Sequence, residues 1–254
     1  MPTRLPLGLA FLFSAMTLAA SAQPRPENMQ LFLLIGQSNM AGRGRVEAPD
    51  KVPHPRVLML TKELAWVPAV DPIHFDKPER IGVGLAKTFG AVVADADPAA
   101  VIGLIPAAFG GSALDEWTPG APHYVNAINR AREAMKHGKL AGILWHQGES
   151  DSAPDKAATY AARFAQIMAQ LRADLGAENV PVIVGETGRF RPDGAAVNAA
   201  LATVPQQVAR CAFVPAEGLT DQGDKLHFDT RSNRELGRRY AQAWLGFSSA
   251  KGAK

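Results

Sequence analysis

Short apolar runs without polar alternation recur along the chain, separated by longer segments with apolar residues three and four positions apart. The short runs are typical of strands covered on both faces, and the longer segments are typical of amphipathic helices. Strands are therefore predicted at 31–35, 57–60, 101–105, 141–145, 181–185 and 211–214, and helices near 81–94, 123–137, 155–175, 194–209 and 231–246. This order predicts an α/β protein, a three-layer α/β/α sandwich with a mainly parallel sheet and right-handed crossovers.

The sequence predicts an N-terminal export signal followed by a single domain. Arg4 precedes an apolar segment, residues 5–20, and Ala20-Ser21-Ala22 forms a small-residue cleavage pattern, which predicts a signal peptide over residues 1–22. The segment is too short for a spanning helix, so we expect a secreted or periplasmic protein without stable membrane insertion after cleavage. Residues 23–254 contain no linker-like stretch and are expected to form a single domain, with the proline-rich residues 43–80 as a loop excursion beside the site.

Charge and cysteine content narrow the function classes. The formal net charge is only +3, and Lys and Arg are scattered among acids, which gives no nucleic-acid signature. Cys211 is the single cysteine, so no intramolecular disulfide is possible, and its apolar neighbours favour a buried structural thiol. Neither a P-loop pattern nor G-x-G-x-x-G follows the first strand, so nucleotide binding is unsupported.

The first predicted strand ends in Gly36-Gln37-Ser38-Asn39. Open α/β sheets bind ligands at the carboxyl ends of their strands, so Ser38 occupies a position suited to a nucleophile. A serine in such a turn can equally cap the next helix, and catalysis needs a base, an acid and oxyanion donors. Met40 stands where the α/β-hydrolase elbow G-x-S-x-G requires glycine, which disfavours that fold.

A base and an acid are available before the last predicted helix. Asp224 precedes His227 by three residues, so one turn can bring the carboxylate to ring Nδ1 while Nε2 faces outward. A second interpretation is that both residues belong to a polar loop that caps the helix. Gly110 and Gly111 allow close backbone approach and can donate an amide to an oxyanion, Gln147 can add a side-chain donor, and Ser38 supplies its own amide.

Four ordered motifs resemble a known family: GQSNMAG at 36–42, FGGSALDEW at 109–117, WHQGESD at 145–151 and DKLH at 224–227. They are similar to blocks of the SGNH hydrolase superfamily, and more narrowly to its sialate O-acetylesterase-like branch, which includes carbohydrate esterase family 6 acetylxylan esterases. The resemblance implies the SGNH hydrolase fold with a flavodoxin-like sheet, and a secreted serine esterase that removes O-acetyl groups from carbohydrates through an acyl-enzyme, without metal or cofactor. It implies Ser38 as nucleophile, His227 as base and Asp224 as its partner, with Gly110 favoured over Gly111 as oxyanion donor beside Gln147.

Substrate contacts and competing functions stay open at this point. Asn39, Arg43, Trp117 and Glu149 are candidate substrate-binding residues, although Trp117 can also pack its own loop, Arg43 can be solvated and Glu149 can hold the Gln147 loop. A metal site would have to use His146, Glu149 and His227, which follow no helical metal-binding pattern. A short-chain lipase or thioesterase of the same superfamily and a noncatalytic carbohydrate-binding module are the two functions that compete with a carbohydrate esterase.

Overall fold

The computed structural model describes Met1 and residues 27–249, so the predicted signal peptide lies outside the described segment 27–249. Within the described residues, one seven-stranded sheet has the order β3-β2-β4-β1-β5-β6-β7. Every neighbouring pair is parallel except β2 and β3. The strands are β1 Met29–Gly36, β2 Val57–Leu60, β3 Trp66–Pro68, β4 Ile102–Pro106, β5 Gly138–His146, β6 Val182–Gly185 and β7 Cys211–Val214. The expected α/β sandwich with a mainly parallel sheet is confirmed.

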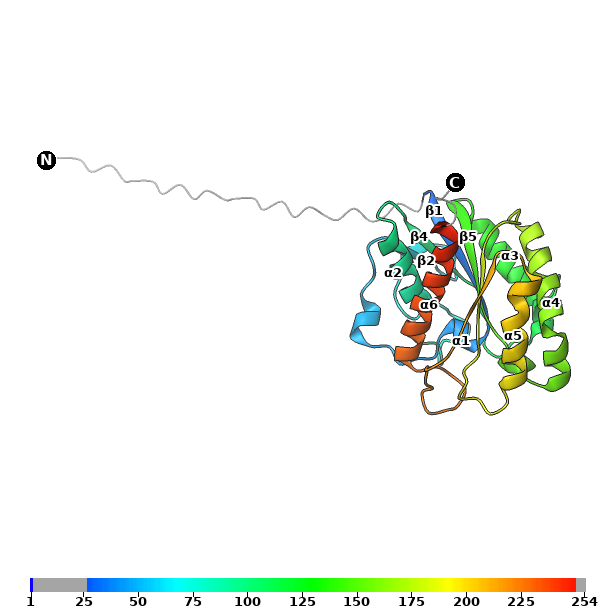
Figure 1. Ribbon diagram of the computed structural model, residues 1–254. Helices are drawn as coiled ribbons and strands as arrows, with labels where there is room; N and C mark the ends of the chain where they lie inside the picture. Colours follow the sequence, from blue (N-terminus) through cyan, green and yellow to red (C-terminus); the bar gives the residue numbers. More distant parts are fainter. Residues whose placement is uncertain (2–26, 250–254) are drawn as a thin grey trace.

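Helices cover both faces of the sheet. The long ones are α2 Ala86–Ala96, α3 Pro122–Ala134, α4 Pro154–Asp174, α5 Ala195–Gln207 and α6 Thr230–Ser249, and the short ones are α1 Ser38–Ala41, η1 Ala48–Lys51, η2 Leu114–Trp117 and η3 Glu149–Asp151. Helices α2 and α6 lie on one face, and α3, α4 and α5 lie on the other (Figure 1). No helix in the segment 27–249 is both long enough and apolar enough to cross a membrane.

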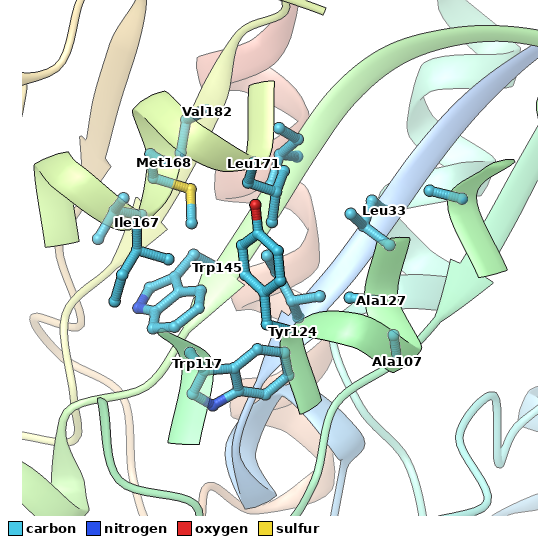
Figure 2. Packing of buried hydrophobic residues seen from close by; sticks show 14 of the residues in the cluster. Leu33, Ala107, Trp117, Tyr124, Ala127, Trp145, Ile167, Met168, Leu171 and Val182 are labelled. Atoms are coloured by element: carbon cyan, nitrogen blue, oxygen red, sulfur yellow. The ribbon is translucent and has the colours of Figure 1, made fainter. Parts of the chain in front are cut away.

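The two faces explain the unbroken apolar run of β1. Leu31, Leu33 and Ile35 point into the core under α3, α4 and α5, whereas Phe32 and Leu34 point into the core under α2 and α6. Side chains alternate between faces along a strand, so a strand buried on both sides needs apolar residues at every position. Figure 2 shows part of the first core, with Leu33 and the rings of Trp117, Tyr124 and Trp145.

The structure differs from the sequence-based expectation in two places. Strand β3 was not expected, because it is only three residues long, half-buried and antiparallel at the sheet edge. The helix expected from residue 81 begins at Ala86, because Val83 forms a β-bridge with Gly44 instead of joining the helix. That bridge fastens the 43–80 excursion beside the end of β1.

Candidate active site

The turn after β1 brings Ser38 to the carboxyl end of the central strand of the sheet. Gly36 has φ +133°, and a Cβ at this position would lie 2.1 Å from the carbonyl oxygen of His146. Only glycine allows β1 and β5 to approach so closely at this point. The Gln37 amide then donates to the same His146 carbonyl at 2.9 Å, and Ser38 begins α1. The nucleophile candidate therefore stands on a turn anchored to the centre of the sheet.

The structure brings His227 and Asp224 to this serine. The Ser38 hydroxyl donates to His227 Nε2 at 3.0 Å, and His227 Nδ1 donates to Asp224 Oδ2 at 2.6 Å. The remaining carboxylate oxygen of Asp224 accepts the amides of Leu226 at 2.9 Å and His227 at 2.8 Å. This is the geometry in which a histidine can take the serine proton while an acid fixes its tautomer.

The electrostatics of Asp224 suit this arrangement. Partial burial favours the neutral acid, but hydrogen bonds from the backbone and ring of His227, from the Gln222 side chain and from the Leu226 amide outweigh it. Together they hold the pKa of Asp224 well below its usual range. The carboxylate is therefore an anion over the pH range of most enzymes, and it can stabilise an imidazolium formed on His227.

The two glycines of the 109–112 turn have different surroundings. The Gly110 amide donates to Asp76 Oδ2 at 2.7 Å, and the same oxygen accepts from Arg43 at 2.9 Å. Within residues 27–249, neither the Gly111 amide nor the Ser38 amide donates to a protein group, and both residues line the pocket. Contrary to the expectation from the resemblance, the structure leaves Gly111 rather than Gly110 with an amide available to an oxyanion.

Gln147 is also placed differently from the expectation. Its side-chain nitrogen donates to the Ser112 carbonyl at 3.1 Å and to Asp151 Oδ2 at 2.6 Å, while its side-chain oxygen accepts the Tyr160 hydroxyl at 2.6 Å. Both amide hydrogens are thus engaged, and the fully buried residue is absent from the pocket wall. The expected role of Gln147 as an oxyanion donor is wrong for this geometry, because the Ser112 and Asp151 acceptors hold its nitrogen inside the core.

Asn39 and Trp117 are not free to bind substrate either, and Arg43 is held by an ion pair. Asn39 is 1% exposed and bonds to Glu149 and to the backbone beside His227. Trp117 is fully buried, donates to Ser112 Oγ and packs edge-on against Trp145 (Figure 2). The Arg43 guanidinium reaches the pocket wall but is paired with Asp76. The expected substrate contacts of Asn39 and Trp117 are therefore wrong, because hydrogen bonds and core packing cover both side chains.

Glu149 and His146, the remaining candidate residues, have different surroundings. Glu149 lines the pocket, with Oε1 bonded to Asn39 and Oε2 without a partner among the described residues. His146 is completely buried, and its Nδ1 contacts the Tyr240 hydroxyl at 3.0 Å. Burial lowers the pKa of His146, so its ring is neutral at physiological pH. Within residues 27–249, no group of three His, Cys, Asp or Glu side chains is arranged to hold a metal ion.

A pocket of about 470 Å³ opens over the Ser38 and His227 pair. Most of its lining residues carry polar or charged side chains, and Leu226 is the one apolar side chain among them. Sequence reasoning missed five basic or amide side chains of this wall, which are Gln37, Lys77, Arg80, Arg191 and Gln222. Arg191 lies in the segment that follows the carboxyl end of β6. Examining the residues after every predicted strand would therefore have identified it. Lys77 and Arg80 both belong to the 43–80 excursion, whose position beside the site was expected.

Similar proteins were found by sequence and by structure. A probable carbohydrate esterase from Arabidopsis thaliana is 33% identical over 242 residues, which cover 87% of this chain and 92% of the plant protein. The crystal structure of that plant protein has a TM-score of 0.81 at 32% identity, over 86% of this chain and 98% of the other.

More distant structures share the fold. The crystal structure of NanS has a TM-score of 0.75 at 19% identity and covers 89% of this chain and 99% of its own. The acetylxylan esterase Axe2 from Geobacillus stearothermophilus has a TM-score of 0.55 at 13% identity, over 86% of this chain and 95% of the other. Both likenesses show that the α/β fold is shared.

Residues 28–246 match the family described as carbohydrate esterase, sialic acid-specific acetylesterase. This match spans every strand of the described sheet and both segments that supply the Ser38, Asp224 and His227 contacts. With the plant relative matched over almost its whole length, it shows that this chain is a member of the sialic acid-specific acetylesterase family of carbohydrate esterases.

Proposed function

We propose that this protein is a serine acetylesterase that removes O-acetyl groups from carbohydrates through an acyl-enzyme intermediate. The observation that carries the proposal is the pair of hydrogen bonds that joins Ser38, His227 and Asp224 at 3.0 and 2.6 Å beside an open pocket. The family assignment supports carbohydrate acetyl esters as the substrate class.

The proposed mechanism uses two acyl transfers. Ser38 Oγ attacks the acetyl carbonyl carbon while its proton passes to His227 Nε2, and the oxyanion accepts hydrogen bonds from the Ser38 and Gly111 amides. The tetrahedral intermediate collapses, the C–O bond to the sugar breaks, and His227 returns the proton to the departing hydroxyl. A water molecule then repeats the sequence on the acetyl-serine, which releases acetate and restores Ser38.

The pocket wall favours a polar alcohol over a lipid. Charged and amide side chains surround the pair, and a long acyl chain would meet Leu226 as the one apolar side chain of the described wall. We therefore expect acetyl esters to react faster than octanoyl esters, and a preference for octanoate would favour a lipase instead. The signal-peptide pattern of residues 1–22 supports a secreted or periplasmic location, which N-terminal sequencing of the protein from its native host tests.

The test is the replacement Ser38→Ala. Hydrolysis of p-nitrophenyl acetate is expected to fall by about 10³-fold or more, because the nucleophile is lost while the fold is kept. Acetate release from acetylated xylan, acetylated monosaccharides and O-acetylated sialic acids then identifies the sugar. Equal activity of the wild-type and Ser38→Ala proteins would refute the proposed mechanism.

A further inference from the structure

We propose that Asn39 is a positioning residue that fastens the loop carrying His227 to the turn carrying Ser38, and that Glu149 fixes the orientation of the Asn39 amide. This inference rests on the proposed function, because it assigns how the base is held against the nucleophile. The bonds that carry it run from Asn39 to Glu149, to the carbonyl of Leu226 and to the amide of Phe228.

The loop over residues 221–228 needs an external attachment. Most of its residues are exposed or half-buried, and it contains no helix or strand, only a β-bridge between Asp221 and Phe228. The loop's internal hydrogen bonds include those from Asp224 to His227 and from Gln222 to His227, which fix the acid against the base. None of these bonds determines how far the imidazole lies from Ser38.

Asn39 supplies that attachment on both sides of the base. Its Nδ2 donates to the Leu226 carbonyl at 3.1 Å, and its Oδ1 accepts the Phe228 amide at 3.1 Å. Among the described residues, these two bonds and the Ser38–His227 bond are the hydrogen bonds between the turn 36–42 and the loop 221–228. The two Asn39 bonds hold the residues immediately before and after His227. They therefore fix the position of the His227 backbone relative to Ser38, which precedes Asn39 in the chain.

Glu149 determines which way the Asn39 amide points. Asn39 Nδ2 donates to Glu149 Oε1 at 2.5 Å, and both residues are buried, at 1% and 7% exposure. A flipped amide would place its oxygen against the carboxylate and the Leu226 carbonyl, and its nitrogen against the Phe228 amide. Acceptors would then face acceptors and a donor would face a donor. Only the observed orientation of the Asn39 amide therefore satisfies all three partners.

The three partners come from segments far apart in the chain. Asn39 lies in α1 after β1, Glu149 lies in η3 after β5, and the base lies in the loop before α6. Catalysis depends strongly on the distance between nucleophile and base, and a displacement of about 1 Å can lower turnover about 100-fold. Asn39 touches no pocket surface, so its loss is expected to reduce kcat rather than substrate affinity.

The experiment compares Asn39→Ala with Asn198→Ala in the full-length mature protein. Asn198 is a matched control, because its side chain also makes three hydrogen bonds, all to Thr187 and none to the triad. With p-nitrophenyl acetate, Asn39→Ala is expected to lower kcat about 100-fold with KM changed less than about threefold. Asn198→Ala is expected to lower the melting temperature while its kcat per folded molecule stays that of the wild type.

A second pair of variants tests the orientation. Asn39→Asp places a carboxylate against Glu149 and is expected to be at least as damaging as Asn39→Ala. Adding Glu149→Gln supplies an amide donor in place of the second carboxylate, so the double variant is expected to recover about 10-fold over Asn39→Asp. A double variant no more active than Asn39→Asp would overturn the role of Glu149.

Labelling of Ser38 by a fluorophosphonate separates this inference from the proposed function, since it reports nucleophile and base geometry without any acetyl ester. Slower labelling of Asn39→Ala than of Asn198→Ala supports the inference even where no acetylated sugar is hydrolysed. Equal labelling rates and equal kcat for Asn39→Ala and the wild type would overturn it. A wild-type protein that is neither labelled nor active on esters would overturn both proposals.

Discussion

Ser38 stands on a turn at the centre of a buried sheet, whereas His227 stands on a loop that is largely exposed. The turn after β1 is confined by the backbone of β5, which leaves no space for a side chain at Gly36. The loop 221–228 is confined by its own hydrogen bonds, by the amide of Asn39 and, at its last residue, by the buried ring of Phe228. One half of the site is therefore held by close packing of the backbone, and the other mainly by directional polar contacts beside one buried ring.

This difference predicts how substitutions in each half affect stability and turnover. Close packing tolerates no added atoms, because a buried backbone cannot move aside without disturbing the strands on both faces. Hydrogen bonds in an exposed loop cost less stability when broken, but their loss changes the position of the base. Damage to the packing of the turn should therefore appear as unfolding, and damage to the hydrogen bonds that hold the loop should appear as lost turnover in a folded protein.

The largest effect is expected from Asp224→Asn. The amide cannot carry the negative charge that stabilises the imidazolium, and it can hold the wrong tautomer of His227, so kcat should fall by about 10³ to 10⁴-fold. The melting temperature should change little, because Asp224 lies in the exposed loop. Steady-state kinetics with p-nitrophenyl acetate measure the effect, and a loss below tenfold would show that the loop positions His227 without its acid.

Two glycine replacements compare the halves directly. Gly36→Ala would place a methyl group 2.1 Å from the His146 carbonyl oxygen, and a loss of more than about 3 kcal/mol of unfolding free energy is expected. Gly223 has φ +102° with nothing within 4 Å of an added Cβ, so Gly223→Ala should cost only about 1 to 2 kcal/mol of backbone strain. Urea unfolding measures both, and equal losses would contradict the contrast between the two regions.

Buried titratable groups near the two halves of the site should also give the stability of the protein different pH dependences. The loop that carries His227 leads into α6, and Arg234 of α6 pairs with Asp50. Burial, followed by the nearby charge of Asp50, raises the pKa of Asp71 to about 7. Because the folded pKa lies above the unfolded one, ionised Asp71 destabilises the fold, from nothing below about pH 4 to a full penalty above pH 7.

Asp71→Asn removes this penalty. The variant should match the wild type near pH 4 and exceed its unfolding free energy by a few kcal/mol at pH 8. Burial lowers the pKa of His146, beside the nucleophile, so its contribution has the opposite sign: it lowers stability at acidic pH, in the wild type and in Asp71→Asn alike. Melting curves at pH 4, 6 and 8 test this, and a gain that does not grow with pH would contradict it.

The smallest effect on turnover is expected from Gln147→Leu. The three hydrogen bonds of Gln147 lie inside the core, so the change should cost about 1 to 3 kcal/mol of stability and lower kcat less than about 10-fold. A donor to the oxyanion would show the reverse, a kcat loss of about 100 to 1000-fold in a stable protein. Kinetics and unfolding on the same preparation distinguish the two roles.

Local patterns in the sequence determined the layers and the positions of Ser38, Asp224 and His227. A strand buried on both faces requires an unbroken apolar run, and an acid three residues before a histidine can reach its ring within one turn. These features depend on neighbours in the chain. Their physical causes are therefore visible before folding.

Only the tertiary structure decided which polar groups face the pocket. Gly110 and Gly111 are adjacent, yet Asp76, more than thirty residues away, binds the amide of Gly110 and leaves that of Gly111 available. Gln147, Trp117 and Asn39 lie in the expected motifs, but Asp151, Ser112 and Glu149 hold them inside the protein. A hydrogen-bonding group has few partners at a time, and distant segments compete for them, so the outcome depends on how those segments pack.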